Sequence, residues 1–433
     1  MQTRFTDAQL ADPDIASCND ILRACVHCGF CTATCPTYAL LGDELAGPRG
    51  RIYLIKEMLE QDRPPSPTDV LHIDRCLSCL ACMTTCPSGV HYMHLVDHAR
   101  AHIERTHRRP WTDRVVRDLL GRVLPDPVRV ARALSLARLA RPVARHLPGI
   151  LGRLLALAPP DRKNKVVTPY ATPAIFPAEG ERKHRVALLA GCVQQAAAPR
   201  INQATVRLLT RHGCEVVVAA GAGCCGALTH HLGQEDRARA AAAANIRAWR
   251  REIEDAGLDA IVVNASGCGT MVKDYGFLFR DDPALAGDAA AVSALARDIS
   301  EFIERIGLRP ATAPASLRVA YQSACSLQHG QRIHRQPVAL LKGCGFEVVE
   351  PTNGHLCCGS AGTYNILQGD IAGRLRERKL ASLAALTPQA IASGNVGCMV
   401  QLAAGAPCPV VHTAELLDWA TGGPRPEPLR GVE

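Results

Sequence analysis

Eight cysteines between residues 25 and 86 have the type and spacing that bind metal. They form two runs of one pattern, C-x2-C-x2-C-x3-C-P, at residues 25–36 and 76–87. Three thiolates on a short loop reach three iron corners of one [4Fe–4S] cube, while the fourth, after a further turn, points away. Zinc sites usually use separated C-x2-C pairs that close one tetrahedron. The two runs therefore predict two [4Fe–4S] clusters and not two zinc sites.

The fourth cysteine of each run is expected to bind the neighbouring cluster. This exchange is the arrangement of two-cluster ferredoxins, which these runs resemble. The first cluster is then bound by Cys25, Cys28, Cys31 and Cys86, and the second cluster by Cys76, Cys79, Cys82 and Cys35.

Helical sequence surrounds both runs, and we predict a helix-rich ferredoxin module over residues 1–105. Residues 51–60 have a helical apolar stripe, a second helix begins near Gly89, and residues 63–67 break the chain between the runs. His91, His94, His98 and His102 share one face of the second helix. They indicate either a haem or metal site or a helix that packs near the clusters.

Composition and charge restrict the setting of the protein. The chain has 433 residues, enough for several domains, and 20 cysteines. Its start, residues 1–7, lacks the apolar segment of a signal peptide, and the cluster motifs need free thiolates, so we expect a reducing cytoplasm. No apolar run is long enough for a membrane-spanning helix.

A basic stretch lies between residues 100 and 165, where 16 Lys and Arg and 5 Asp and Glu give a local charge of +11. We predict a basic helical connector followed by a Pro-rich linker over residues 106–180. The stretch is interpreted as a solvated connector, an arm that binds a partner subunit, or a helix on anionic lipid. Nucleic acid is excluded, since Trp111 is its one aromatic residue and no nucleic-acid motif is present.

From about residue 185 short apolar strands alternate with Ala-rich helices, a pattern typical of parallel α/β domains. The pattern repeats, with strands expected at residues 185–192, 215–218 and 261–268 in one half and at 318–325 and 346–349 in the other. The first cysteine precedes a cysteine pair by 32 residues in both halves. We therefore predict two pseudo-equivalent domains, over residues 181–310 and 311–433.

The cysteines of each half fall at or just after the ends of the expected strands, where open α/β sheets place ligands. Four thiols in each half are expected to converge, on a further metal centre or in a pocket that faces a quinone, a flavin or a partner. The two sets are Cys192, Cys224, Cys225, Cys268 and Cys325, Cys357, Cys358, Cys398. The lone cysteines, Cys18, Cys214, Cys344 and Cys408, are expected to be small core residues.

The repeated pattern resembles the cysteine-rich CCG domain of heterodisulfide reductase subunits and their relatives. In that family the fuller motif ends in C-x2-C and can hold a non-cubane iron–sulfur cluster. Here Met271 and Gln401 stand at the last position, so each half departs from the family pattern by one cysteine. The resemblance implies an iron–sulfur site but leaves a non-cubane cluster open.

Nearly the whole chain resembles the iron–sulfur subunits of glycolate oxidase and of anaerobic glycerol-3-phosphate dehydrogenase, most closely the former. The cluster runs followed by two CCG repeats carry this resemblance, together with residues 25–38, 47–52, 86–92 and 412–419. It implies an α+β multidomain chain, with a ferredoxin module followed by two CCG domains of parallel-sheet character.

The same resemblance implies an electron-transfer subunit. A separate FAD-containing subunit would oxidise a 2-hydroxy acid, and this chain would pass electrons to a membrane quinone or respiratory acceptor at the inner face of the cell membrane. The chain has no flavin or nicotinamide fingerprint of its own, which fits this division. Alternatives are the equivalent subunit for glycerol 3-phosphate or D-lactate, a CCG enzyme like heterodisulfide reductase, and an iron–sulfur sensor.

Overall fold

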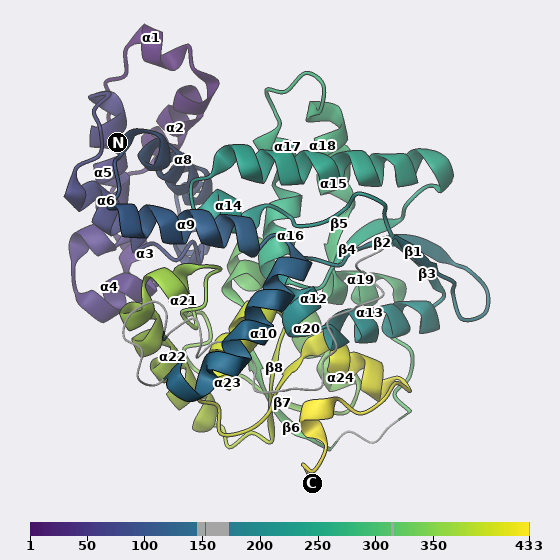
Figure 1. Cartoon of the computed structure of the whole chain (residues 1–433). Coiled ribbons are helices and arrows are strands. Elements are labelled where there is room, and N and C mark those ends of the chain that lie inside the picture. The colour runs from purple at the N-terminus through teal and green to yellow at the C-terminus, as the bar shows by residue number, and fades with distance from the viewer. Residues whose placement is uncertain (145–151, 153–172, 313–315, 433) are drawn as a thin grey trace.

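The computed structural model describes residues 1–144, 152, 173–312 and 316–432, and the account below concerns these residues. They form a helical N-terminal region, purple to blue in Figure 1, and two α/β halves, teal to yellow. The predicted fold class, a helix-rich module followed by two α/β domains with parallel-sheet character, is confirmed.

The N-terminal region is held together by short helices around one apolar core. Leu22, Ile55 and Leu95, from three different helices, are fully buried in that core. The elements are α1 (Asp7–Leu10), α2 (Pro13–Ala24), α3 (Phe30–Ala33), α4 (Pro36–Leu41), η1 (Glu44–Ala46), α5 (Pro48–Glu60), α6 (Pro67–Asp74), α7 (Ala81–Thr85) and α8 (Tyr92–Thr106).

Prolines decide where several of these helices begin. Helices α2, α4, α5 and α6 all start with proline, whose missing N–H is not needed in the first turn. Ser66 caps α6 by accepting a hydrogen bond from the backbone N–H of Asp69. Helix α4 starts at Pro36, directly after Cys35, so the proline of the first run turns the chain away from the cysteine loop.

The basic stretch is tied to the N-terminal region and to both halves. It contains α9 (Trp111–Val123) and α10 (Pro127–Ala144), which cross the front of the molecule in Figure 1. Arg117 of α9 forms an ion pair with Asp74 at 2.8 Å, and Leu120 packs against Leu232 and Ile366. The rest of the stretch to Lys165 and most of the predicted Pro-rich linker lie outside the described residues.

Each half is built on a mainly parallel sheet, and the two sheets share one strand order. The first sheet runs β1 (Ala174–Phe176), β3 (Cys214–Val218), β2 (His184–Leu189), β4 (Ala260–Val263), β5 (Ala296–Asp298). The second runs β7 (Glu347–Val349), β6 (Arg318–Gln322), β8 (Ala390–Ser393), β9 (Val410–His412). Without β1 the orders are equivalent, as the repeated cysteine pattern predicts.

Strand β1 is the exception to the parallel pattern. It pairs antiparallel with β3 and covers the edge of the first sheet. It lies before residue 181, inside the stretch expected to be linker, so this sheet recruits chain from outside the predicted first domain.

Helices cover the faces of both sheets. The first half contains α12 (Val193–Ala197), α13 (Arg200–Arg211), α14 (Ala227–His231), α15 (Glu235–Ala256), α16 (Ser266–Lys273), α17 (Tyr275–Leu278), α18 (Ala286–Leu295) and α19 (Ile299–Ile306). The second half contains η2 (Ser326–Gly330), α20 (Arg335–Gly343), α21 (Tyr364–Leu367), α22 (Gly369–Ala384), α23 (Val396–Ala403), α24 (Thr413–Ala420) and η3 (Glu427–Leu429).

The halves pack through reciprocal helix pairs. Helix α13 of the first half contacts α24 of the second, and α20 of the second contacts α19 of the first. One apolar core runs through this contact and includes Leu208, Phe302, Leu341 and Leu417. The halves are therefore joined as a pseudo-symmetric pair by a large apolar surface.

The expected strand over residues 261–268 is too long. Strand β4 stops at Val263, and Cys268 lies on helix α16. The buried amide of Asn264 donates to Asn202 Oδ1 at 2.9 Å and to Thr205 Oγ1 at 2.8 Å. These side-chain hydrogen bonds take the place of backbone hydrogen bonds between strands at the end of β4. The residues with short side chains that follow begin helix α16.

The glycine after each cysteine pair is required by its backbone. Gly226 and Gly359 have φ of +87° and +88°, and an added Cβ would lie 2.8 Å from the carbonyl oxygen of Ala238 or 2.6 Å from that of Ala372. Each cysteine pair is therefore pressed onto a long helix, α15 or α22, at a point where only glycine fits.

We predict that Gly359→Ala destabilises the protein. The left-handed backbone alone costs about 1–2 kcal/mol for alanine, before the collision with Ala372. Thermal unfolding should begin at a lower temperature than in the wild type. Gly373→Ala, on α22 with no atom within 4 Å of the added Cβ, is the matched control and should not destabilise. Equal unfolding of the Gly359→Ala protein and the wild type would contradict the assignment.

Candidate functional site

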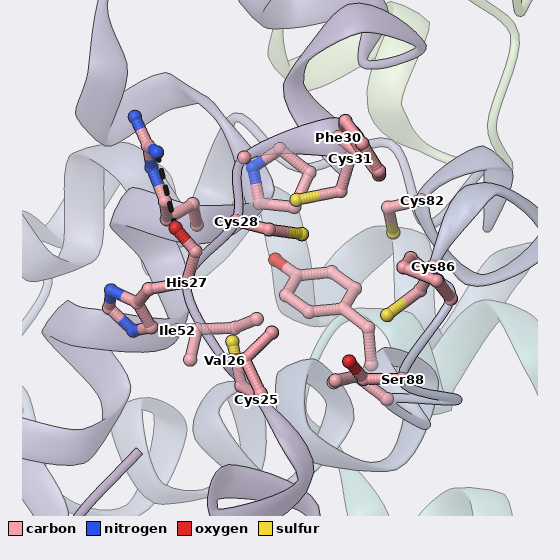
Figure 2. A pocket seen from close by; sticks show the side chains of 16 residues that line it. Cys25, Val26, His27, Cys28, Phe30, Cys31, Ile52, Cys82, Cys86 and Ser88 are labelled. Carbon is pink, nitrogen blue, oxygen red and sulfur yellow. Dashed lines mark hydrogen bonds between the residues drawn. The ribbon is translucent and has the colours of Figure 1, made fainter.

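The two cysteine runs of the N-terminal region line two adjacent cavities. The first cavity is lined by Cys25, Cys28 and Cys31 of the first run and by Cys86 of the second. Figure 2 shows these four sulfur atoms directed into the space between the loops. The structure thus brings together the four residues expected to bind the first cluster.

The second cavity is lined by Cys76, Cys79 and Cys82 of the second run and by Cys35 of the first. Cys82 also borders the first cavity, so the two cavities share a wall. Each cavity takes three cysteines from one run and the fourth from the other. This lining has the form that the expected exchange of ligands would need, and the exchange itself stays a prediction.

Both loops are wound in the same way. The residue before the second cysteine and the residue after it have positive φ: His27 (57°) and Gly29 (85°) in the first loop, Ser78 (47°) and Leu80 (61°) in the second. A non-glycine residue in this conformation costs about 1–2 kcal/mol. The residues with positive φ curl each loop around its cavity. Backbone strain of this kind is typical of functional sites.

The second cavity has the charge of an anion-binding site. Arg51 is 1% exposed and donates to His72 O at 2.7 Å and Thr37 Oγ1 at 3.0 Å, but no carboxylate of the described residues pairs with it. Burial alone would raise the pKa of Cys76, yet the guanidinium groups of Arg51 and Arg100 hold it below its usual value. A buried cation without a carboxylate fits a thiolate-ligated cluster, which is anionic.

Two further thiols of the second cavity favour the protonated form in the absence of a metal. Burial raises the pKa of Cys79 and of Cys82 well above the usual range. Iron would bind these sulfurs as thiolates and release their protons. Backbone and side-chain donors already reach the sulfur of Cys76, from Ser78 N at 3.5 Å and from the Tyr92 hydroxyl at 3.7 Å.

The first cavity lies at the surface of the protein. Cys28 is exposed, and Val26 and Phe30 beside it are 67% and 62% exposed. Burial raises the pKa of Cys31, deeper in the cavity, to about 11. The first cavity thus has exposed residues in its lining, whereas all four cysteines that line the second cavity are buried.

The four cysteines of each C-terminal half also converge. In the first half, the four thiols act on one another's pKa: Cys224 and Cys268 are among the groups that raise the pKa of Cys192 and of Cys225. Hydrogen bonds from Cys192 and Cys225 lower the pKa of Cys224 to about 4. We call these four residues the first thiol group.

The second thiol group consists of Cys325, Cys357, Cys358 and Cys398. Cys325 Sγ lies 3.7 Å from Cys357 Sγ, and Cys358 interacts with both Cys357 and Cys398 in ways that shift the pKa of all three thiols. Hydrogen bonds from Cys357 and Cys398 lower the pKa of Cys358. All eight C-terminal candidate cysteines therefore lie in one of two four-thiol groups.

No fifth thiol completes either group at the position where the CCG family has one. Met271 packs in the apolar core of the first half. Gln401 is buried and hydrogen-bonds to Asn365 at 3.1 Å and to the carbonyl of Ala372 at 3.2 Å. Each group therefore contains four thiols, one fewer than the family pattern, as the sequence indicates.

The two thiol groups lie differently with respect to the N-terminal region. Cys79 of the second cavity shares an apolar cluster with Cys357 and Tyr364, and Cys325 packs against that cluster. The cluster that holds Cys225 of the first thiol group contains, among the described residues, none from the N-terminal region. The second thiol group is thus the one adjacent to the second cavity.

The histidines of α8 pack against the first half. His94 Nε2 lies 2.9 Å from Asp274 Oδ1, and its ring stacks on Phe277 at 3.4 Å between centroids. His91, which precedes the helix, stacks on His94 at 4.0 Å. Within the described ranges no group of three or more His, Cys, Asp or Glu side chains is arranged around a single metal ion. The packing interpretation accounts for His91 and His94.

The lone cysteines are mostly core residues. Cys18, Cys214 and Cys344 are buried as expected. Cys408, in the short loop before β9, is half-buried and packs against the apolar core of the second half.

Comparisons with known proteins agree with this geometry. A 4Fe-4S dicluster domain matches residues 24–90, and a cysteine-rich domain, CCG, matches residues 186–273 and 319–403. The glycolate oxidase iron-sulfur subunit of Escherichia coli (strain K12) is 41% identical over 421 residues, which are 97% of this chain and 99% of that protein.

Two further relatives extend the comparison. A Bacillus subtilis (strain 168) protein named as a probable glycolate oxidase iron-sulfur subunit is 32% identical over 93% of this chain and 94% of its own length. Lactate utilization protein A of Geobacillus thermodenitrificans is 28% identical over 54% of this chain and 98% of its own length. Together with the family models, these similarities support iron–sulfur clusters as the cofactors.

We predict that Cys35→Ser damages the cluster of the second cavity and leaves the cluster of the first. Cys35 stands in the first run but lines the second cavity, so removing its sulfur leaves that cluster with three thiolates. Redox titration followed by EPR should show one altered cluster with the iron of the other retained. Cys408→Ser, in a half-buried loop cysteine, is the matched control and should change neither. Loss of the first cluster alone would contradict the exchange.

Proposed function

The chain belongs to the family of glycolate oxidase iron–sulfur subunits, and on that premise we propose that it carries electrons in a complex that oxidises glycolate to glyoxylate. The observation that carries the proposal is the pair of adjacent four-cysteine cavities, one with exposed lining residues and one whose four cysteines are all buried. Two redox sites with a shared wall would make a path for electrons.

We propose one [4Fe–4S] cluster in each cavity. Cys25, Cys28, Cys31 and Cys86 would hold the first, and Cys76, Cys79, Cys82 and Cys35 the second. Such clusters, when bound, take up and release one electron at a time. Arg51 and Arg100 would supply the positive charge that a buried anionic cluster needs.

A flavin subunit is the partner that this chemistry requires. Oxidation of glycolate to glyoxylate releases two electrons and two protons, and a flavin accepts both electrons and passes them on singly. We propose an FAD-containing catalytic subunit that docks at the exposed first cavity, beside Val26 and Phe30. The electrons would leave for a membrane quinone or another respiratory acceptor.

The C-terminal halves extend the path. We propose a further iron–sulfur centre in this part of the chain, with the first thiol group (Cys192, Cys224, Cys225, Cys268) and the second thiol group as its candidate ligands. Convergence of four thiols, with one pKa in each group lowered by its neighbours, supports metal binding over an apolar role. The second group is the nearer continuation, since Cys325 packs against the cluster that contains Cys79.

Attachment to the membrane would be peripheral. No helix in the described part of the chain is long and apolar enough to cross a bilayer. We propose a cytoplasmic subunit at the inner face of the cell membrane, held there by its partners and by α9. Trp111, Val115 and Leu119 are exposed at four-residue spacing on that helix, with Arg114 and Arg122 beside them, as in helices that rest on anionic lipid.

The substrate is tested by reduction of the clusters through the flavin partner. Full-length chain, co-purified with its flavin subunit, is mixed anaerobically with glycolate, and cluster reduction is followed by EPR. We expect reduction by glycolate in the complex and none in the isolated chain. Glycerol 3-phosphate and D-lactate are the comparison substrates, the latter because a relative is named for lactate utilization.

Three outcomes would contradict the proposal. Faster reduction by glycerol 3-phosphate or by D-lactate would assign the chain to that substrate instead. Reduction of the isolated chain by glycolate would place the substrate site here. Turnover of a disulfide by the isolated chain would favour the heterodisulfide reductase-like alternative, which the four-thiol groups without a fifth cysteine do not support.

A further inference from the structure

A buried lysine distinguishes the second thiol group from the first. Lys379 lies on α22 and is 3% exposed. Its ammonium donates to the carbonyl of Gly354 at 2.9 Å. No carboxylate of the described residues forms an ion pair with it, and the groups whose charges act on it are Cys358, Cys357, Cys325 and Cys398. This cation stands on the helix whose Ala372 and Leu375 pack against Cys357 and whose Ala372 meets Gly359, directly behind the cysteine pair.

The equivalent position in the first half is an asparagine. Gly226 and Gly359 contact Ala238 and Ala372, so these alanines are equivalent between the repeats. Asn245 and Lys379 each follow that alanine by seven residues. The two repeats thus place different side chains at the same point behind their cysteine pairs.

Asn245 holds the backbone around the first cysteine pair with an uncharged side chain. It accepts from Gly223 N at 2.7 Å and donates to the carbonyl of Cys224 at 2.9 Å and to the Tyr275 hydroxyl at 3.1 Å. Its amide satisfies backbone groups around the first thiol group. A lysine at this point is not needed to hold the fold of the repeat, because an uncharged side chain does so in the first half.

The second thiol group is also the one in contact with the N-terminal module. Tyr364 donates to the carbonyl of Arg75, next to Cys76, at 3.1 Å, and shares an apolar cluster with Cys79 and Cys357. Thr84 Oγ1 lies 2.7 Å from His329 Nδ1 at the same contact. A charge placed behind this thiol group therefore acts at the point where electrons would pass from the module to the C-terminal half.

We propose that Lys379 is a positioning residue that supplies the counter-charge for a metal centre held by Cys325, Cys357, Cys358 and Cys398 and thereby raises its reduction potential. Removing one buried charge from an anionic metal–thiolate group without compensation is costly, and a nearby cation favours the more negative, reduced state. The step itself moves one electron from the reduced cluster of the second cavity to this centre, and Lys379 is unchanged by it. The inference rests on the proposed further centre in the C-terminal half.

The test compares charge with hydrogen bonding at position 379. Lys379→Gln keeps a donor for Gly354 but removes the charge, Lys379→Arg restores the charge, and Arg378→Gln removes an exposed cation one residue away on α22. The full-length protein is prepared anaerobically and titrated potentiometrically with EPR detection. We expect a lower potential of the C-terminal centre in Lys379→Gln, the wild-type potential in Lys379→Arg, and no shift in Arg378→Gln. The cluster of the first cavity is the internal reference.

A second variant keeps the proposal testable if Lys379→Gln does not fold. Lys379→Met keeps the buried stem and leaves no unpaired charge, a change that proteins often tolerate, and it should lower the potential as Lys379→Gln does. An unchanged potential in a folded, charge-free variant overturns the proposal and assigns Lys379 to tying the Gly354 loop. Absence of any redox centre beyond the N-terminal clusters in the wild type also overturns it, but leaves the glycolate-driven reduction of those clusters intact.

Discussion

The exchange of the fourth cysteine between two loops is the constraint on which the N-terminal region depends. Cys35 and Cys86 each line the cavity built by the other run, so neither cavity is complete without both loops. The loops must therefore meet back to back although about forty residues separate them. Helix α4 starts directly after Cys35, and α5 brings Arg51 to the second cavity, so the intervening chain returns at a fixed position.

Buried charge connects this module to the rest of the molecule. Arg100 donates to the carbonyl of Cys76 at 2.7 Å and to Asp97 at 3.3 Å. Asp97 in turn lies 3.4 Å from both His230 and His231 of α14 in the first half. Although burial opposes ionisation, the two histidines hold the pKa of Asp97 well below its usual value. A network of ion pairs thus connects the second cavity to the first half, and apolar packing connects it to the second half.

Much of this arrangement could be predicted from the sequence, because it is local. Cysteine spacing fixes which thiols share a loop, and the repeated interval between Cys192 and Cys224 and between Cys325 and Cys357 predicts two equivalent halves. Long-range features could not be predicted. Strand β1 joins its sheet by antiparallel pairing with β3, which no periodicity in three residues can indicate. The same holds for the end of β4, which a network through Asn264 determines.

Buried cations are the other features that sequence reasoning missed. Arg51 and Lys379 stand among ordinary charged residues of helical segments, and a lysine or arginine on a helix is normally solvated. Only the three-dimensional structure places them behind thiols without a carboxylate partner. A weak signal existed at one of them: in aligned repeats, an asparagine in one half corresponds to a lysine in the other.

The central claim, two clusters held by exchanged ligands in adjacent cavities, is tested most directly by EPR of the fully reduced full-length protein with iron and sulfide analysis. The account predicts at least about eight irons per chain with matching acid-labile sulfide, since each cavity holds a four-iron cluster. It also predicts a spectrum broadened by magnetic interaction between neighbouring clusters, because Cys82 borders both cavities. Stoichiometric zinc without sulfide, or two reduced clusters that show no interaction, would contradict it.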